Sequence, residues 1–205
     1  MTAEVSTIYL LDVATGDSVE AELRDAIEDT DLHDWKSKWQ PEIDALREDL
    51  ERRSVPRNQW PQSLHWNWQR KMDFADGLIG IRGFSVTVQG ETQGLALVDL
   101  TKSAREPSQL GKALVYLDYL EVAPWNRADL GRAIKLKGVG TALLTAVVAL
   151  SEVEDFKGRM GLHSLPQSEE FYRQWCGMTD LGPDAAYSGL RYFEMTAEQA
   201  SSFLK

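Results

Sequence analysis

The first quarter of the chain changes from a strand-like apolar run to a helical pattern. Ile8 to Val13 (IYLLDV) is continuously apolar apart from Asp12 and precedes a Thr-Gly-Asp turn, which predicts a first strand. From residue 17 to residue 53, apolar side chains recur at helical spacing, which predicts two or three amphipathic helices with charged outer faces. These positions are Val19, Leu23, Ala26, Ile27, Leu32, Trp35, Trp39, Ile43, Leu46 and Leu50. Pro41 interrupts the rhythm, and proline is best tolerated as the first residue of a new helix.

The rest of the chain is predicted to form short strands with helices between them. The expected strands lie at 83–89, 94–100, 113–124, 159–164 and 189–195. The expected helices lie at 138–152 and 167–176, and the capping box TAEQ (196–199) opens a terminal helix. Residues 56–71 form an irregular segment whose three tryptophans either pack in the core or line a binding pocket. This order predicts an α/β (α+β) fold, a mixed central sheet flanked by helices with an elaborated helical N-terminal half.

Composition narrows the class of protein. The chain is 43% hydrophobic and 26% charged, which is typical of a globular domain. Its net charge of −10 argues against a general nucleic-acid binder or a membrane-surface binder. Cys176 is the only cysteine, and His33, His65 and His163 are scattered, so we expect neither an intrachain disulfide nor a metal site. The N-terminus lacks a signal-peptide pattern and no long apolar run occurs, so we expect a cytoplasmic protein.

The segment Lys135 to Gly140 (KLKGVG) stands directly before the strongest helical pattern of the chain. Backbone N–H groups at a helix start are unsatisfied, the helix dipole favours an anion there, and glycines allow a phosphate to approach closely. The alternative is a plain strand-to-helix turn eased by its glycines. A P-loop is excluded because Thr141 follows Gly140 where that motif needs lysine. A dinucleotide fingerprint is excluded because Leu143 stands where it needs a small residue.

Three short motifs, taken in order, resemble the GNAT acetyltransferase superfamily. The first is the strand end LEVAP (120–124), the second is KLKGVG (135–140), and the third is FYRQWCGM (171–178). Their order and their strand-helix context agree with that superfamily over about residues 83–195. The resemblance implies a single GNAT-like domain over 1–205. It would comprise an N-terminal strand and helices at about 1–80, a cofactor-binding core at about 83–195 and a terminal helix at 196–204.

The chain departs from the GNAT pattern in four places. Lys135 replaces the usual glutamine or arginine, and extra residues separate Pro124 from the glycines. Tyr172 stands five residues before its glycine instead of four. The asparagine that often precedes the tyrosine helix is missing, with Leu165 near that point.

The resemblance implies acetyl-CoA as cosubstrate, bound where two neighbouring parallel strands splay apart. Backbone groups of the first strand would pair with the pantetheine as an extra strand would, and the glycine loop would hold the pyrophosphate. The implied cofactor-binding residues are Leu120, Glu121, Val122, Lys135, Lys137, Gly138, Val139, Gly140, Thr141 and Ala142.

The resemblance also suggests catalytic groups, each with a structural alternative. Tyr172 is the candidate acid for the leaving thiolate, or else a half-buried aromatic of an amphipathic helix. Asp118 is the first candidate base, or else a solvated strand residue, because a bulge could reset the side-chain parity. Glu121, on the opposite parity, is the second candidate base. His163 ends the neighbouring strand and could relay the amine proton, or else be a hydrogen-bonded core residue.

The expected function is transfer of an acetyl group from acetyl-CoA to a primary amine by direct attack on the thioester. The acceptor would be an amine-bearing small molecule, or a protein or peptide, and a homodimer is plausible. The alternative is a non-catalytic CoA-binding or protein-interaction module with a GNAT-like fold. Transfer of a larger acyl group is a third possibility. The N-terminal helices and the last hairpin carry no motif that identifies the acceptor.

Overall fold

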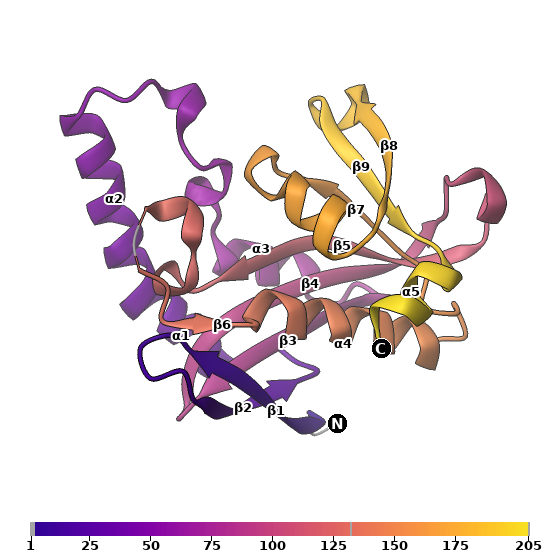
Figure 1. Ribbon diagram of the computed structural model, residues 1–205, viewed down its shortest axis with the longest axis horizontal. Coiled ribbons are helices and arrows are strands. Elements are labelled where there is room, and N and C mark those ends of the chain that lie inside the picture. Colours follow the sequence, from indigo (N-terminus) through magenta and orange to yellow (C-terminus); the bar gives the residue numbers. More distant parts are fainter. Residues whose placement is uncertain (1–2, 132, 205) are drawn as a thin grey trace. The chain divides into compact units, whose positions relative to one another are not determined.

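The computed structural model describes residues 3–131 and 133–204. Within them, nine strands form one mixed sheet in the order β6-β1-β2-β3-β4-β5-β7-β9-β8 (Figure 1). The strands are β1 (Val5–Asp12), β2 (Ser18–Arg24), β3 (Ile81–Val88), β4 (Glu91–Ser103), β5 (Ala113–Val122), β6 (Leu136–Lys137), β7 (Met160–Ser164), β8 (Thr179–Asp184) and β9 (Leu190–Met195). The α-helices are α1 (Asp29–Asp34), α2 (Gln40–Arg52), α3 (Trp68–Ala75), α4 (Val139–Val153) and α5 (Ala197–Phe203). The predicted α/β class with a mixed sheet and flanking helices is confirmed.

The chain divides into two compact units. The first unit comprises Met1–Leu78, Gly83–Leu95 and Leu120–Leu143. The second comprises Ile79–Arg82, Ala96–Tyr119 and Leu144–Lys205. Among the helices of the described residues, none is long and apolar enough to cross a membrane.

The helical segment of the first unit is fastened to the start of β4. Asp34 accepts a hydrogen bond from the Thr92 backbone N–H at 2.9 Å, and Asp31 accepts one from the Thr92 hydroxyl at 2.8 Å. Trp39, fully buried, donates from its indole N–H to the Thr92 carbonyl at 3.2 Å. A π-helical turn, Trp35–Trp39, joins α1 to α2. Pro41 is the second residue of α2 and does not open a new helix as predicted, because the helical run continues through it from Asp29 to Arg52.

The prediction that a helix begins near residue 17 is wrong, because Ser18–Arg24 is β2. In the segment SVEAELR, apolar and charged residues also alternate from Val19 to Leu23. Val19, Ala21 and Leu23 are less exposed than the two glutamates between them. A four-residue interval such as Val19 to Leu23 fits both a helix and a strand. Pairing with β1, in which Tyr9 lies opposite Glu20, decides in favour of the strand.

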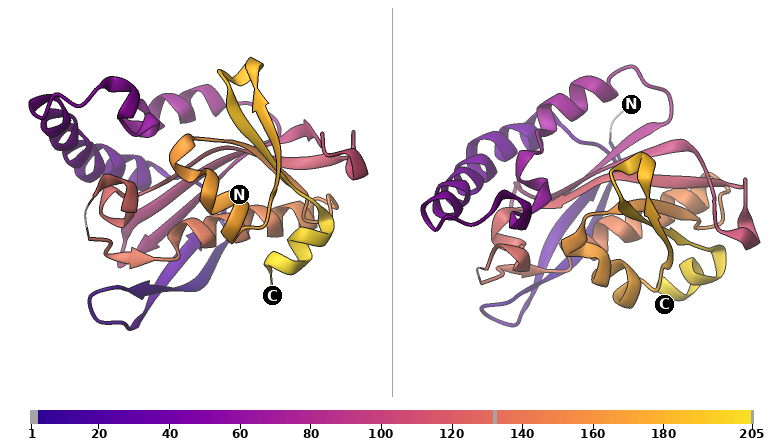
Figure 2. Two further views of the ribbon diagram at one scale, coloured as in Figure 1. Left: turned by 45° about the horizontal axis from the view of Figure 1, so that its top comes forward. Right: turned by 90° about the horizontal axis from the view of Figure 1, so that it is seen from above.

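The second unit contains the parallel pair of the sheet and a C-terminal hairpin. β5 runs parallel to β7, and β9 lies antiparallel between β7 and β8 (Figure 2). β8 was not predicted, because Gly182 and Pro183 interrupt it and its pairing with β9 shifts between Asp180 and Pro183. The predicted capping box is confirmed: Thr196 and Gln199 exchange hydrogen bonds at the start of α5.

Candidate functional site

The glycine segment is held on both sides before α4 begins. The Lys135 carbonyl accepts the Val13 N–H at 2.9 Å, and the Lys135 N–H donates to the Trp125 carbonyl at 2.9 Å. Two residues further on, Lys137 pairs with Leu11 of β1 through the short strand β6. The segment is therefore fixed as an edge strand, and α4 starts from a defined point.

The first turn of α4 presents backbone donors and two glycines with different roles. Gly138 has φ of 101°, a conformation that favours glycine, and its carbonyl accepts the first helical hydrogen bond from Ala142 at 2.8 Å. The N–H groups of Val139, Gly140 and Thr141 precede that bond. A Cβ atom on Gly140 would lie 3.9 Å from side-chain atoms of Leu120 and Val122, which is ordinary contact. Packing therefore does not require glycine at 140, although glycine inside a helix costs about 0.5–1 kcal/mol relative to alanine.

Two lysines of the glycine segment are solvent-exposed, as their predicted role requires. Lys135 and Lys137 are both exposed, and the Lys135 ammonium lies 5.4 Å from the centre of the Trp125 ring. This places positive charge on the segment that leads into the first turn of α4.

A buried amide pair that sequence reasoning missed fixes the loop between β5 and β6. The Gln93 side-chain carbonyl accepts from the Trp125 indole at 2.8 Å and from the Asn126 amide at 2.9 Å. Asn126 in turn accepts the Leu136 N–H at 2.9 Å. The extra residues after Pro124 are thus organised by hydrogen bonds to β4. The polar residue Gln93 at the start of an apolar strand was the only signal.

Glu121 lies in a buried network of the first unit. Its side chain is 4% exposed and accepts the Trp68 indole N–H at 2.7 Å. The Arg127 guanidinium lies 3.4 Å from its other oxygen and also pairs with Asp129 at 2.6 Å. Burial raises the pKa of Glu121 to about 7, although Arg127 and Trp68 favour the carboxylate. Trp68, fully buried, is a core residue that orients this carboxyl group.

In the second unit, β5 and β7 are paired over only part of their length. Within the residues that the structure describes, their ladder runs from Val115 opposite Met160 to Leu117 opposite Leu162. β5 continues beyond it with Asp118 and Tyr119, and β7 continues to Ser164. We call the end of this ladder the fork. Asp118, the first candidate base, is half-buried directly after the last paired residue of β5.

His163 follows Leu162, the last residue of β7 that pairs with β5, and both ring nitrogens of His163 have polar partners. Nδ1 lies 2.6 Å from the Tyr116 hydroxyl, and Nε2 lies 3.1 Å from an Asp184 carboxylate oxygen. The Tyr187 ring stacks on the imidazole at 3.7 Å between ring centres. Burial lowers the pKa of His163, and Arg105 lowers it further, whereas Asp184 raises it. His163 is therefore a hydrogen-bonded, neutral imidazole near pH 7.

Tyr172 lies in a π-helical turn, Phe171–Trp175, and this turn accounts for its unusual distance from Gly177. The Cys176 N–H donates to the Phe171 carbonyl at 3.1 Å, a five-residue bond that accommodates one more residue than an α-helical turn. The Tyr172 ring is 8% exposed and lies 6.1 Å from the Phe193 ring. Burial raises the pKa of its hydroxyl, so Tyr172 is protonated at neutral pH.

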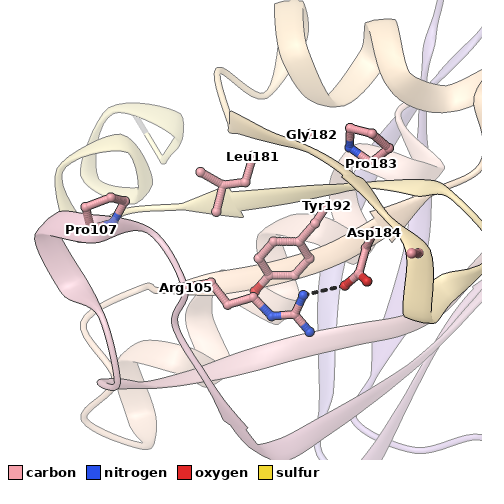
Figure 3. A pocket seen from close by; sticks show the side chains of 8 residues that line it. Arg105, Pro107, Leu181, Gly182, Pro183, Asp184 and Tyr192 are labelled. Atoms are coloured by element: carbon pink, nitrogen blue, oxygen red, sulfur yellow. Dashed lines mark hydrogen bonds and ion pairs between the residues drawn. The ribbon is translucent and has the colours of Figure 1, made fainter.

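A surface pocket of the second unit is lined in part by Asp184, the hydrogen-bond partner of His163 (Figure 3). Arg105 and Asp184 face each other in it with 2.5 Å between their nitrogen and oxygen atoms, and the Arg105 guanidinium lies 4.4 Å from the centre of the Tyr192 ring. Leu181 and Pro183 belong to its apolar wall. Asp184 thus connects the buried imidazole with a pocket that opens to solvent.

The predicted cofactor-binding residues all belong to the first unit, and among them Leu120 and Val122 lie next to Gly140. Asp118, His163 and Tyr172 belong to the second unit. Among the described residues, no group of histidine, cysteine and carboxylate side chains is arranged to hold a metal ion.

Comparison with proteins of known structure identifies the fold of the chain. No protein-family model matches the sequence, and no curated protein matches it significantly. The GNAT domain of S. lividans PAT has a similar structure, with a TM-score of 0.54 and 16% identity over 93% of this chain and 96% of that one. A protein described as a GNAT-family acetyltransferase, from Desulfovibrio desulfuricans, gives a TM-score of 0.50 and 14% identity over 85% of this chain and 96% of that one. The chain therefore has the fold of the GNAT superfamily, as its motifs predicted.

Proposed function

We propose that this protein transfers an acetyl group from acetyl-CoA to a primary amine. The observation that supports this best is Gly140, a helical glycine with ordinary space for a Cβ atom beside Leu120 and Val122. A residue of this kind lowers helix stability without a packing reason, so a close approach of the backbone to a ligand is the remaining physical reason. The neighbouring lysines and the unsatisfied N–H groups of the first helical turn select an anion.

The proposed cofactor site follows from these groups. The N–H groups from Gly138 to Thr141, together with Lys135 and Lys137, would hold the pyrophosphate, with Ala142 completing the first helical turn. The backbone of β5 from Leu120 to Val122 would pair with the pantetheine as an added strand. The GNAT fold supports this assignment, because it is an acyltransferase fold.

The proposed chemistry needs an acid and a base. Attack of a neutral amine on the thioester carbon forms the C–N bond and expels a thiolate, which takes a proton. Tyr172 is the proposed acid, because its buried hydroxyl keeps its proton at neutral pH. Asp118, Glu121 and His163 remain the candidates for the base that removes the amine proton.

Cofactor binding is tested first, by thermal unfolding in the presence of acetyl-CoA, CoA, NAD or ATP at matched concentrations. A ligand at 100 times its dissociation constant stabilises the folded state by roughly 2.7 kcal/mol, which is readily measured. Stabilisation by acetyl-CoA and CoA, but not by NAD or ATP, is the expected result. No stabilisation by either CoA species would leave the glycine segment as a plain strand-to-helix turn.

Catalysis is tested separately, by release of free CoA thiol from acetyl-CoA with a panel of small amines, amino acids and peptides. Release that depends on the amine, with the acetylated product found by mass spectrometry, is the expected result. Binding of CoA without transfer to any member of the panel would instead favour a CoA-binding module that lacks catalysis.

A further inference from the structure

We propose that Tyr116, His163 and Asp184 form a proton relay in which Asp184 orients His163, and His163 accepts the proton of the Tyr116 hydroxyl. The inference rests on the proposed acetyl transfer and names the groups that would take the amine proton. All three residues lie in the second unit, on β5, β7 and β8. Their hydrogen bonds are consecutive: 2.6 Å from Tyr116 Oη to Nδ1, and 3.1 Å from Nε2 to Asp184 Oδ2.

The charge on Asp184 sets the tautomer of His163. Hydrogen bonds from the Arg105 guanidinium, the Ala186 N–H and His163 lower the pKa of Asp184 to about 2, so its carboxylate is ionised at neutral pH. An ionised carboxylate only accepts hydrogen bonds, so His163 donates from Nε2–H. Nδ1 then carries the lone pair and accepts the O–H of Tyr116. The hydroxyl oxygen of Tyr116 keeps its own lone pairs. Because Tyr116 is only 5% exposed, the relay requires the substrate amine to reach this oxygen.

The surroundings keep His163 neutral, which a proton acceptor requires. The groups that face the imidazole are Tyr116 from β5, Asp184 from β8, Tyr187 from the following turn, Tyr192 from β9 and Arg105 from the loop after β4. Of these, Arg105 opposes a positive charge on the ring and Asp184 favours one. Only 3% of the His163 side chain is exposed, so its two hydrogen bonds are shielded from competing water.

The relay crosses between β5 and β7 at the fork. Tyr116 lies opposite Gly161 within the ladder, and its hydroxyl reaches the imidazole of His163 just beyond the last paired residue, Leu162. Tyr116 and His163 therefore meet where these two strands part, within the second unit. The other end of the relay, Asp184, lines the open pocket of Figure 3.

The proposed step balances without an ionised Tyr116. As the amine nitrogen bonds to the thioester carbon, its proton passes to Tyr116 Oη while the Tyr116 proton passes to His163 Nδ1. The C–S bond breaks, and the thiolate takes a proton from Tyr172. The products are the amide, free CoA, an imidazolium paired with Asp184 and the phenolate of Tyr172. The imidazolium then releases its proton to solvent, and Tyr172 takes one back from solvent. Burial raises the pKa of Tyr116, so a concerted transfer is the route that fits.

The test compares Tyr116→Phe and Asp184→Asn with the wild type in the thiol-release assay. Tyr116→Phe removes only the hydroxyl, and Asp184→Asn removes the negative charge that stabilises the imidazolium formed on His163. Each variant is expected to lose about 10²-fold or more in kcat, the contribution typical of general acid–base catalysis. Tyr9→Phe is the matched control, because Tyr9 is 68% exposed on β1. The activity of this variant should equal that of the wild type.

Two further readouts separate a relay from a structural role. Below the lowered pKa of His163 the imidazole is protonated, so the wild-type rate should fall on the acid side of the pH profile; this limb should vanish in Tyr116→Phe. Long-range 15N NMR should show the Nε2–H tautomer of His163 in the wild type, with no proton on Nδ1. If Tyr116→Phe has the same kcat and pH profile as the wild type, the relay is wrong, whereas the proposed acetyl transfer stands. Absence of transfer from the wild type, despite the expected tautomer, would overturn the proposed function and with it the relay.

Discussion

Gly94 of β4 and Val139 of α4 are in direct contact, because a Cβ atom on Gly94 would lie 2.5 Å from Cγ1 of Val139. The same atom would lie 3.0 Å from Cδ1 of Leu143. The absence of a side chain at 94 therefore lets the first turn of α4 pack on the strand. This contact sets the position of the helix start that we propose as the pyrophosphate site.

Gly94→Ala should destabilise the protein by about 1–3 kcal/mol, the usual cost of overpacking a core. At this chain length that corresponds to a decrease in Tm of roughly 2–4 °C for each kcal/mol. Urea unfolding at constant pH measures it. Gly140→Ala is the matched control, because it adds the same methyl group at a position where that group would make only ordinary van der Waals contacts. Equal stability of the two variants would show that α4 does not depend on the contact at Gly94.

Gly140→Ala should separate folding from ligand binding. Alanine has the higher helix propensity, so the protein without ligand should be about 0.5–1 kcal/mol more stable than the wild type. Its affinity for acetyl-CoA should fall at least about tenfold, which corresponds to roughly 1.4 kcal/mol, because the methyl group obstructs a close phosphate. Isothermal titration with acetyl-CoA measures the second effect. Thr145→Ala, at an exposed position of the same helix, controls for helix propensity; unchanged affinity in Gly140→Ala would remove the proposed cradle.

Tyr172→Phe should keep the thermal stabilisation by acetyl-CoA and lose acetyl transfer by about 10²–10⁴-fold, because it removes only the hydroxyl that we propose as the acid. The thermal-shift titration and the thiol-release assay are run on the same preparation. The exposed Tyr9→Phe again serves as the control for loss of a tyrosine hydroxyl. Unchanged turnover would exclude Tyr172 from the mechanism and leave it a packing partner of Phe193.

Glu121 should make stability depend on pH. Its pKa in the folded protein is about 7, above the ordinary value of 4.5, so the folded state binds the proton more tightly than the unfolded state. The stabilising contribution is complete below pH 4.5 and is lost as pH rises through 7. The loss is on the order of 3 kcal/mol. Urea unfolding of the wild type and Glu121→Gln at pH 5 and pH 8 measures it: the variant should show the smaller decrease. The same decrease in both proteins would show that Glu121 is not the cause.

Local sequence patterns were sufficient to predict most of the helices and strands. A long apolar run predicted β5, helical spacing predicted α4, and the TAEQ box predicted α5, because each signal arises from neighbouring residues. β2 was predicted wrongly, because the interval from Val19 to Leu23 fits both the helical and the strand periodicity. Pairing with β1 stabilises the strand. β8 was not predicted, because a strand that contains glycine, proline and a bulge forms only through its pairing with β9.

The amino-acid sequence by itself determined the GNAT-like order of motifs and the glycine segment at the start of α4. It also supplied the candidates Asp118, Glu121, His163 and Tyr172. Only the tertiary structure decided that Glu121 is buried against Trp68 and that His163 joins Tyr116 to Asp184, because residues far apart in the chain meet there. Hydrogen bonds and burial change the protonation of such groups, and no local pattern records which partner a folded chain will bring to them.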